Sequence, residues 1–146
     1  MATTGEATIQ RSEELVDLLT RFYQAAQSGD TAFLEHFISA QEGVLCIGTD
    51  PQEWWQGAGT IGRVFKAQVE EMGGSFPLEP GSPEGYREGS VGWVADRPKL
   101  KLPDGTEMEF RLTMVCHQEA GEWKLVQAHF SIGVPNEEAV GKGLTV

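Results

Sequence analysis

The spacing of apolar side chains changes once along the chain, and this change constrains the fold more than any other feature. Up to residue 74 apolar residues recur at helical spacing in three segments, whereas beyond residue 90 they alternate with polar residues. The helical stripes are Leu15, Leu18, Leu19, Phe22, Tyr23 and Ala26, then Phe33, Leu34, Phe37 and Ile38, then Ile61, Val64, Phe65, Val69 and Met72. Helices followed by strands predict an α+β domain.

Signals at the ends of these segments support three helices. Ser12 is an N-cap residue, and Asp30 after Gly29 ends one helix and caps the next. The pair Gly73-Gly74 is typical of a helix C-terminus. A short apolar run over 44–49 predicts a strand between the second and third helices.

The second half of the chain predicts an antiparallel meander. Strand-like segments run over about 90–102, 107–118 and 122–134, and glycine-containing turns separate them. Strands this long in a small domain indicate a strongly curved antiparallel sheet that closes over the helices. The preceding segment, 75–90, is rich in proline and glycine, which predicts a short edge strand over 76–79 and then a loop.

The length of 146 residues suits one domain. We expect a disordered N-terminus over 1–11, a single domain over 12–134 and a C-terminal tail over 135–146.

Composition argues against several classes of partner. The net charge of -11 would repel a phosphate backbone or an anionic membrane, so we expect no nucleic acid and no membrane partner. No apolar run approaches the roughly 18 residues of a membrane span, and the first residues do not resemble a signal peptide, which predicts a cytoplasmic protein. Cys46 and Cys116 form no metal-ligand pattern with the three histidines, so neither a metal nor a cofactor is expected.

The alternation assigns two faces to the sheet. Phe110, Met114 and Phe130 should point toward the helices, and Asp96 is the one carboxylate that this parity turns inward. The outward set is polar and is the candidate dimer face: Arg111, Thr113, Gln127, His129 and Ser131.

Three stretches make the chain resemble the SnoaL-like branch of the nuclear transport factor 2-like superfamily. They are "AAQSGDTAFLEHF" (25–37), "GTDPQEWWQG" (48–57) and "RLTMVCHQEAGEWKLVQAHFSIGVPNEE" (111–138), which contains W-x5-H-x-S. The resemblance covers nearly the whole chain beyond the first ten residues. It implies a cone-shaped roll, in which three N-terminal helices pack in a curved sheet with a C-terminal three-strand meander, around an apolar pocket. It also implies a homodimer. Since the superfamily holds isomerases, cyclases, dehydratases and non-catalytic adaptors, the fold leaves function open.

Two catalytic patterns of this superfamily can be compared with the chain. Ketosteroid isomerases use a tyrosine, an aspartate and a further carboxylic acid, and these positions fall on Phe22, Cys46 and near Phe110, none of which can perform that chemistry. SnoaL-type cyclases use a carboxylate and a histidine. The available residues are Asp96, which could instead be a partly solvated residue at a strand end, and His129, which has the parity of the outer face.

The stretch "GTDPQEWWQG" places adjacent indoles in a predicted loop near the open end of the cone. Adjacent side chains point in different directions, so one of Trp54 and Trp55 can line a pocket while the other packs elsewhere, or both can seal the core. The pocket predicted from the resemblance and the parity comprises Phe22, Cys46, Trp54, Trp55, Phe110, Met114 and Phe130.

Two functions follow from these expectations. The first is a domain that binds a small apolar or aromatic molecule, with cofactor-independent isomerase, cyclase or lyase chemistry as its catalytic form and Asp96 as the acid–base group. The alternative is a non-catalytic dimerisation or regulatory association domain whose cone is filled by its own core. An open cavity would distinguish the first from the second.

Overall fold

A computed structural model describes residues 7–146 and confirms the α+β class. Three main helices precede most of the sheet, namely α1 (Glu13–Ser28), α2 (Thr31–His36) and α3 (Ala58–Glu71). The Oγ of Ser12 accepts a hydrogen bond from the backbone N–H of Leu15 at 3.3 Å, and the carboxylate of Asp30 accepts one from Phe33 at 3.1 Å. Gly29 ends α1 in the left-handed conformation at φ 72°. The caps predicted from the sequence are therefore the ones that set these helix ends.

Seven strands form the main sheet in the order β1-β5-β6-β9-β10-β2-β3. Their bounds are β1 (Gln10–Arg11), β2 (Leu45–Ile47), β3 (Trp54–Gln56), β5 (Glu84–Glu88), β6 (Val91–Asp96), β9 (Arg111–Glu119) and β10 (Glu122–Ser131). Every pair is antiparallel except β2 with β10. A second sheet has the order β4-β7-β8, with β4 (Leu78–Glu79), β7 (Lys99–Lys101) and β8 (Glu107–Glu109).

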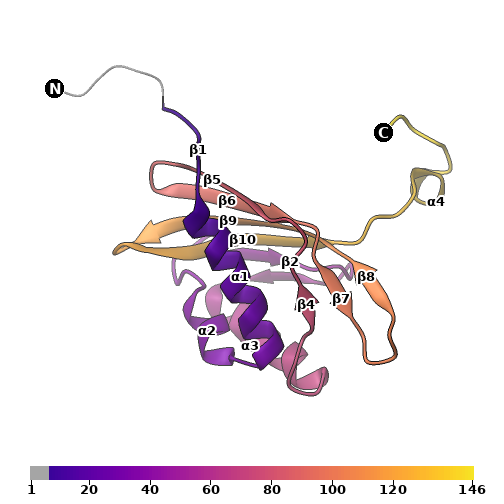
Figure 1. Ribbon diagram of the computed structural model, residues 1–146, viewed down its shortest axis with the longest axis horizontal. Coiled ribbons are helices and arrows are strands. Elements are labelled where there is room, and N and C mark those ends of the chain that lie inside the picture. Colours follow the sequence, from indigo (N-terminus) through magenta and orange to yellow (C-terminus); the bar gives the residue numbers. More distant parts are fainter. Residues whose placement is uncertain (1–6) are drawn as a thin grey trace.

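The predicted meander is present, but its first two strands are broken. The segment 90–102 divides into β6 and β7 at Arg97–Pro98, where proline cannot donate to a ladder. The segment 107–118 divides at Phe110, whose N–H donates instead to the carbonyl of Pro98 at 2.8 Å. These two breaks lie side by side, so the β6–β9 ribbon leaves the main sheet and continues as the second sheet, which Figure 1 shows at the right.

Two segments expected to be loops form strands. Trp54–Gln56 pairs with β2 as β3, and Glu84–Glu88 pairs with β6 as β5. Prolines precede both strands but do not fall inside them, so composition hid short strands whose pairing comes from partners distant in sequence. Gly85 also permits close packing, because a Cβ there would lie 2.7 Å from the carbonyl oxygen of Ser12.

The two chain ends differ from the domain between them. Within the predicted disordered segment 1–11, residues 1–6 lie outside the described residues, and Gln10–Arg11 pairs with β5 rather than lacking structure. This pairing satisfies backbone groups that the polar composition suggested would face water. The tail contains a short helix, α4 (Asn136–Val140), which lies away from the sheet in Figure 1.

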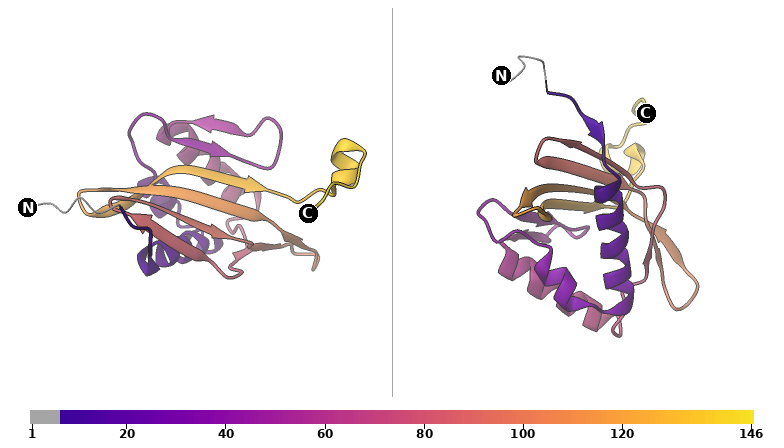
Figure 2. Two further views of the ribbon diagram at one scale, coloured as in Figure 1. Left: turned by 90° about the horizontal axis from the view of Figure 1, so that it is seen from above. Right: turned by 60° about the vertical axis from the view of Figure 1, so that its left-hand side comes forward.

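The core fills the space between the sheet and its helices. Helices α1, α2 and α3 cover one face of the main sheet, and none of them covers the opposite, outer face (Figures 1 and 2). Inward-facing Leu112, Met114 and Cys116 of β9 are buried, as is Leu125 of β10. A bulge between Leu125 and Gln127 lets both Leu125 and Ala128 face inward, which strict alternation would not allow. None of the helices in residues 7–146 is long and apolar enough to span a membrane.

Candidate functional site

A cavity of about 290 Å³ opens between α1, α3 and the end of the main sheet near the bend of the β6–β9 ribbon. Its walls come from α1, α2, α3, the loop before β3, the segment before β4, and strands near the bend of the β6–β9 ribbon. Its lining includes Phe22, Ala26, Glu53, Trp55, Gln68 and Phe130. The volume suits a small organic molecule rather than a large one.

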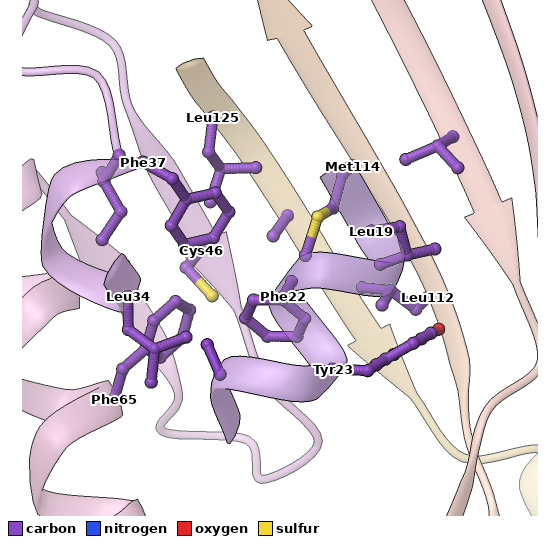
Figure 3. Close-up of a cluster of buried hydrophobic side chains, with 14 of the residues drawn as sticks. Leu19, Phe22, Tyr23, Leu34, Phe37, Cys46, Phe65, Leu112, Met114 and Leu125 are labelled. Carbon is purple, nitrogen blue, oxygen red and sulfur yellow. The ribbon is translucent and has the colours of Figure 1, made fainter. Parts of the chain in front are cut away.

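Aromatic rings form much of the cavity wall. The ring of Phe22 lies at the centre, with its centroid 5.9 Å from that of Phe65 and 6.3 Å from that of Phe130. Figure 3 shows Phe22 pointing from α1 toward Phe65 on α3. Phe76 and Phe110 line the same space. These rings offer a large apolar surface with little conformational freedom to lose on binding.

The structure brings part of the predicted pocket together. Phe22, Trp55, Phe110 and Phe130 line the cavity. Cys46 and Met114 face inward as predicted, but they are fully buried in the core next to it and are not among its lining residues. Both belong to the cluster of buried core side chains that Figure 3 draws, and neither has exposed surface.

The paired indoles lie on opposite sides of the sheet. Because β3 is a strand, Trp54 and Trp55 alternate: Trp55 lines the cavity, whereas Trp54 is 59% exposed on the outer face. Trp55 pairs with the inward-facing Cys46, and Trp54 pairs with Ile47. The expectation that the two point differently holds, and the strand period explains it.

Glu53 is the polar side chain that the loop before β3 is built around. Its carboxylate lines the cavity and accepts hydrogen bonds from the backbone N–H of Asp50 at 2.8 Å, the Nε2 of Gln68 at 3.1 Å and the hydroxyl of Thr49 at 3.5 Å. A Cβ at Gly48 would lie 2.5 Å from the carboxylate oxygen, so only glycine leaves room for it there. The side chain is therefore fixed from three directions at the cavity mouth.

Burial raises the pKa of the Cys46 thiol, which lies in the core next to the cavity. Desolvation, reinforced by the charge of Glu53, raises the pKa of Cys46 to about 12. This thiol stays protonated at neutral pH, which is the property of an inert core cysteine rather than a nucleophile.

Asp96 is buried outside the cavity lining and is surrounded by donors. Its carboxylate accepts hydrogen bonds from the hydroxyl of Tyr23 at 2.7 Å, the N–H of Gly81 at 3.0 Å and the N–H of Ser82 at 2.8 Å. Burial, followed by the hydrogen bond to Asp96, raises the pKa of Tyr23 far above its ordinary value. This arrangement joins α1 to the segment before β5. The inward parity of Asp96 agrees with the sequence, while its catalytic role stays a prediction.

The residues predicted for a dimer face share the outer face of the sheet. Cross-strand pairing aligns Thr113 with His129 and Arg111 with Ser131, and the Nε of Arg111 donates to the Oγ of Ser131 at 3.2 Å. Apolar side chains lie on the same face, with Val115 among these polar residues and the others on the flanking strands β6, β2 and β3: Leu45, Ile47, Trp54, Val91 and Trp93. Trp54, predicted to line the pocket, is therefore part of the outer face instead. The outer face is thus less polar than the alternation predicted.

A second polar cluster joins the segment after α2 to the β9–β10 hairpin by hydrogen bonds. The carboxylate of Glu119 accepts a hydrogen bond from the hydroxyl of Ser39 and contacts the ring of His117. These contacts, that of Ser39 first, lower the pKa of Glu119. Over residues 7–146, no three His, Cys, Asp or Glu side chains gather in a way that could hold a metal ion.

The comparisons with known proteins agree with this geometry. The family model described as "SnoaL-like domain" matches residues 15–135. The chain belongs to the SnoaL-like family. Its fold is that of the nuclear transport factor 2-like superfamily, as the structural neighbours also show. The comparison with curated proteins finds no match.

Solved structures that resemble this SnoaL-like chain in fold are described with different functions. A nuclear transport factor 2-like protein of unknown function from Pseudomonas putida has a TM-score of 0.75 at 15% identity, covering 90% of this chain and 92% of that one. A candidate ketosteroid isomerase from Parabacteroides distasonis has a TM-score of 0.65 at 14% identity, covering 81% and 86%. A candidate calcium/calmodulin-dependent protein kinase type II association domain from Thiobacillus denitrificans has a TM-score of 0.67 at 19% identity, covering 80% and 92%. At such identities the likeness shows the fold alone.

Proposed function

We propose that this SnoaL-like protein binds a small apolar or aromatic molecule in the cavity between α1, α3 and the sheet. The observation that carries the proposal is the open space of about 290 Å³ beside Phe22, Trp55 and Phe130. Pockets for small molecules are mostly apolar and hold a few fixed polar groups, and Glu53 with Gln68 supplies these here.

The alternative function is a regulatory association domain whose cone is filled. The large inward side chains near Leu19, Phe37 and Met114 do fill the upper part of the cone, where the core is dense. The lower part is different, because five phenylalanine rings and Trp55 surround space that they leave open. A domain needing only a core would gain stability from filling this space, since an empty cavity loses packing contacts. The cavity therefore favours binding.

We also propose that the protein is a homodimer that pairs through the outer face of the main sheet. The five predicted residues lie on β9 and β10, with apolar side chains of β6 on one side of them and of β2 and β3 on the other. Together they form a band across the outer face, in which Trp54 is 59% exposed and Val91 is 44% exposed. Exposed apolar patches bordered by polar groups are typical of interfaces. A dimer would cover this band while leaving the cavity, on the other side of the sheet, free to bind.

The structure suggests which groups a catalytic form would use. Cofactor-independent isomerase, cyclase or lyase chemistry needs a group that moves a proton at the ligand. Both carboxylates accept three hydrogen bonds, but Glu53 lines the cavity, whereas Asp96 is buried outside its lining. We therefore assign proton transfer in any such reaction to Glu53 and a positioning role to Asp96. The candidate ketosteroid isomerase among the structural neighbours makes this class of reaction a reasonable one to assay.

Native mass spectrometry of the freshly purified protein, beside a denaturing spectrum, tests the binding proposal. We expect an excess mass that denaturation removes, and we expect the variant Ala26→Leu to lose it. Ala26 lines the cavity from α1, so a larger side chain occupies ligand space at little cost to the helix. If neither protein carries an excess mass, and naphthylmethanol binds both equally or not at all, the binding proposal is wrong.

A further inference from the structure

The polar end of the cavity offers acceptors and no basic side chain. Glu53 and Glu71 each present a carboxylate, and Glu53 is the one that hydrogen bonds hold in place. The Nε2 of Gln68 is used as a donor to Glu53, which leaves the amide oxygen of Gln68 as an acceptor. Among the cavity-lining residues of the described chain there is no lysine, arginine or histidine. The polar end therefore cannot neutralise an anionic ligand.

The carboxylate of Glu53 is held in place but is not saturated. An ionised carboxylate offers about four acceptor positions. The three donors found here are Asp50, Thr49 and Gln68, and the contact from Thr49 is long at 3.5 Å. The Oε2 atom accepts only from Gln68 within the described residues. One further donor, from a ligand, can bind without displacing the loop.

The loop shows that the position of this carboxylate is built rather than incidental. Gly48 leaves the space that the Glu53 side chain occupies, and its N–H donates to the carbonyl of Glu53 at 2.8 Å. The N–H of Glu53 in turn donates to the carbonyl of Asp50 at 2.9 Å. A short closed loop thus presents the carboxylate at the start of β3, two residues before Trp55.

The aromatic walls add to the attraction for a cation. A cation within about 6 Å of an aromatic ring is attracted by the electron density of the ring face, and the interaction strengthens when water is excluded. Trp55 and Phe76 line the cavity together with Glu53. The net charge of -11 also raises the local concentration of cations relative to anions.

We propose that the cavity selects an apolar or aromatic amine, bound with its rings among the phenylalanines and its ammonium group against Glu53. This inference rests on the proposed binding function and narrows it to one ligand class. A neutral molecule of the same shape keeps the ring contacts and loses the ion pair, while a carboxylate of the same shape meets Glu53 as a like charge.

A matched series of probes tests the proposal on the full-length protein by isothermal titration calorimetry at neutral pH. The probes are naphthylmethylamine, naphthylmethanol and naphthoate, which share one ring system and differ at the polar end. We expect the amine to bind about tenfold or more tightly than the alcohol, and naphthoate to bind most weakly. In Glu53→Gln, which keeps the shape and hydrogen-bonding capacity of the side chain, the amine should lose most of its advantage over the alcohol. Glu71→Gln, which removes the other carboxylate lining the cavity, should cost the amine less.

Two controls separate the ion pair from the general acidity of the protein. Glu70→Gln removes one exposed carboxylate of α3 that does not line the cavity, and it should keep the preference for the amine. The preference should also persist, reduced, in roughly 1 M salt, where charges more than about 3 Å apart are screened.

The outcomes distinguish the two proposals. Equal affinity of the amine and the alcohol for the unaltered protein, or equal loss of the preference in Glu70→Gln and Glu53→Gln, overturns the amine proposal and leaves the binding function standing. Failure of all three probes to bind, with the protein folded, overturns both.

Discussion

The two faces of the main sheet differ in what covers them, and the adjacent residues Trp54 and Trp55 show this difference most directly. Trp55 faces the helices and lines a cavity with a fixed carboxylate at its mouth, whereas Trp54 is exposed on a face that α1, α2 and α3 leave bare. The inner face is therefore suited to a small ligand and the outer face to a second copy of the chain. Because the two surfaces share strands but not side chains, substitutions can alter one and spare the other.

The largest expected effect comes from breaking the outer face. Val115 lies on it between Trp93 and Gln127. Val115→Glu would place a charge at the centre of the proposed interface. We therefore expect the dissociation constant of the dimer to rise by more than about a hundredfold. Analytical ultracentrifugation over a concentration series measures it. If the unaltered protein is a monomer throughout, or the variant remains equally dimeric, the outer face is not the interface.

Asp96→Asn tests whether Asp96 stabilises the fold or acts as an acid–base group on the ligand. An asparagine would turn an amide NH₂ toward one of three donors, so we expect a loss of about 2–3 kcal/mol in the free energy of unfolding. Denaturant titration gives this value, with Tyr23→Phe as a milder control that removes one donor. A variant of unchanged stability that has lost turnover would instead restore Asp96 as the acid–base group.

Substituting each indole separately sharpens the comparison between the faces. Trp55→Ala should weaken binding of naphthylmethanol by about tenfold, because it removes a cavity wall. Trp54→Ala should leave that affinity unchanged and weaken only self-association. Parallel calorimetry and ultracentrifugation of both variants measure the two effects. Equal loss of ligand affinity in both variants would contradict the separation of the faces.

The smallest effect concerns the pH dependence of the cluster around Glu119. Its contacts with Ser39 and His117 lower its pKa in the folded state, so they stabilise the protein above the ordinary glutamate pKa of about 4.3 and are lost as pH falls through the lowered value. Glu119→Gln should reduce stability at neutral pH and converge with the unaltered protein in acid. Denaturant titrations across this range check it, and a difference that grows in acid would contradict it.

Much of the fold could be predicted because its signals are local. The caps at Ser12 and Asp30, the three apolar stripes and the parity of the long strands each depend on neighbours within a few residues. The strand β5 could not be predicted from its own residues, because it is held by pairing with β1, which lies some seventy residues earlier in the chain, and with β6, which follows it. Of the two strand breaks that start the second sheet, the sequence signals only the one at Pro98. The break at Phe110 arises from its hydrogen bond to the carbonyl of Pro98.

The candidate site was less predictable for the same reason. Phe22, Trp55, Phe110 and Phe130 follow from the resemblance and the parity, and they line the cavity. Glu53 and Gln68 were missed, since a glutamate in a loop and a glutamine on a helix become a site only when the loop folds against α3. The sequence does contain one signal, a glycine at 48 followed five residues later by an acid, but its meaning depends on the contact that the folded loop makes.

The most direct test of the account follows the indole N–H signals of the four tryptophans by ¹H–¹⁵N NMR while naphthylmethylamine is added. We predict that the signal of Trp55 moves with saturation, that Trp54 stays in place, and that Glu53→Gln weakens the response of Trp55. Movement of Trp54 in place of Trp55, or no movement of Trp55 at saturating probe, would contradict a ligand cavity on the inner face of the sheet.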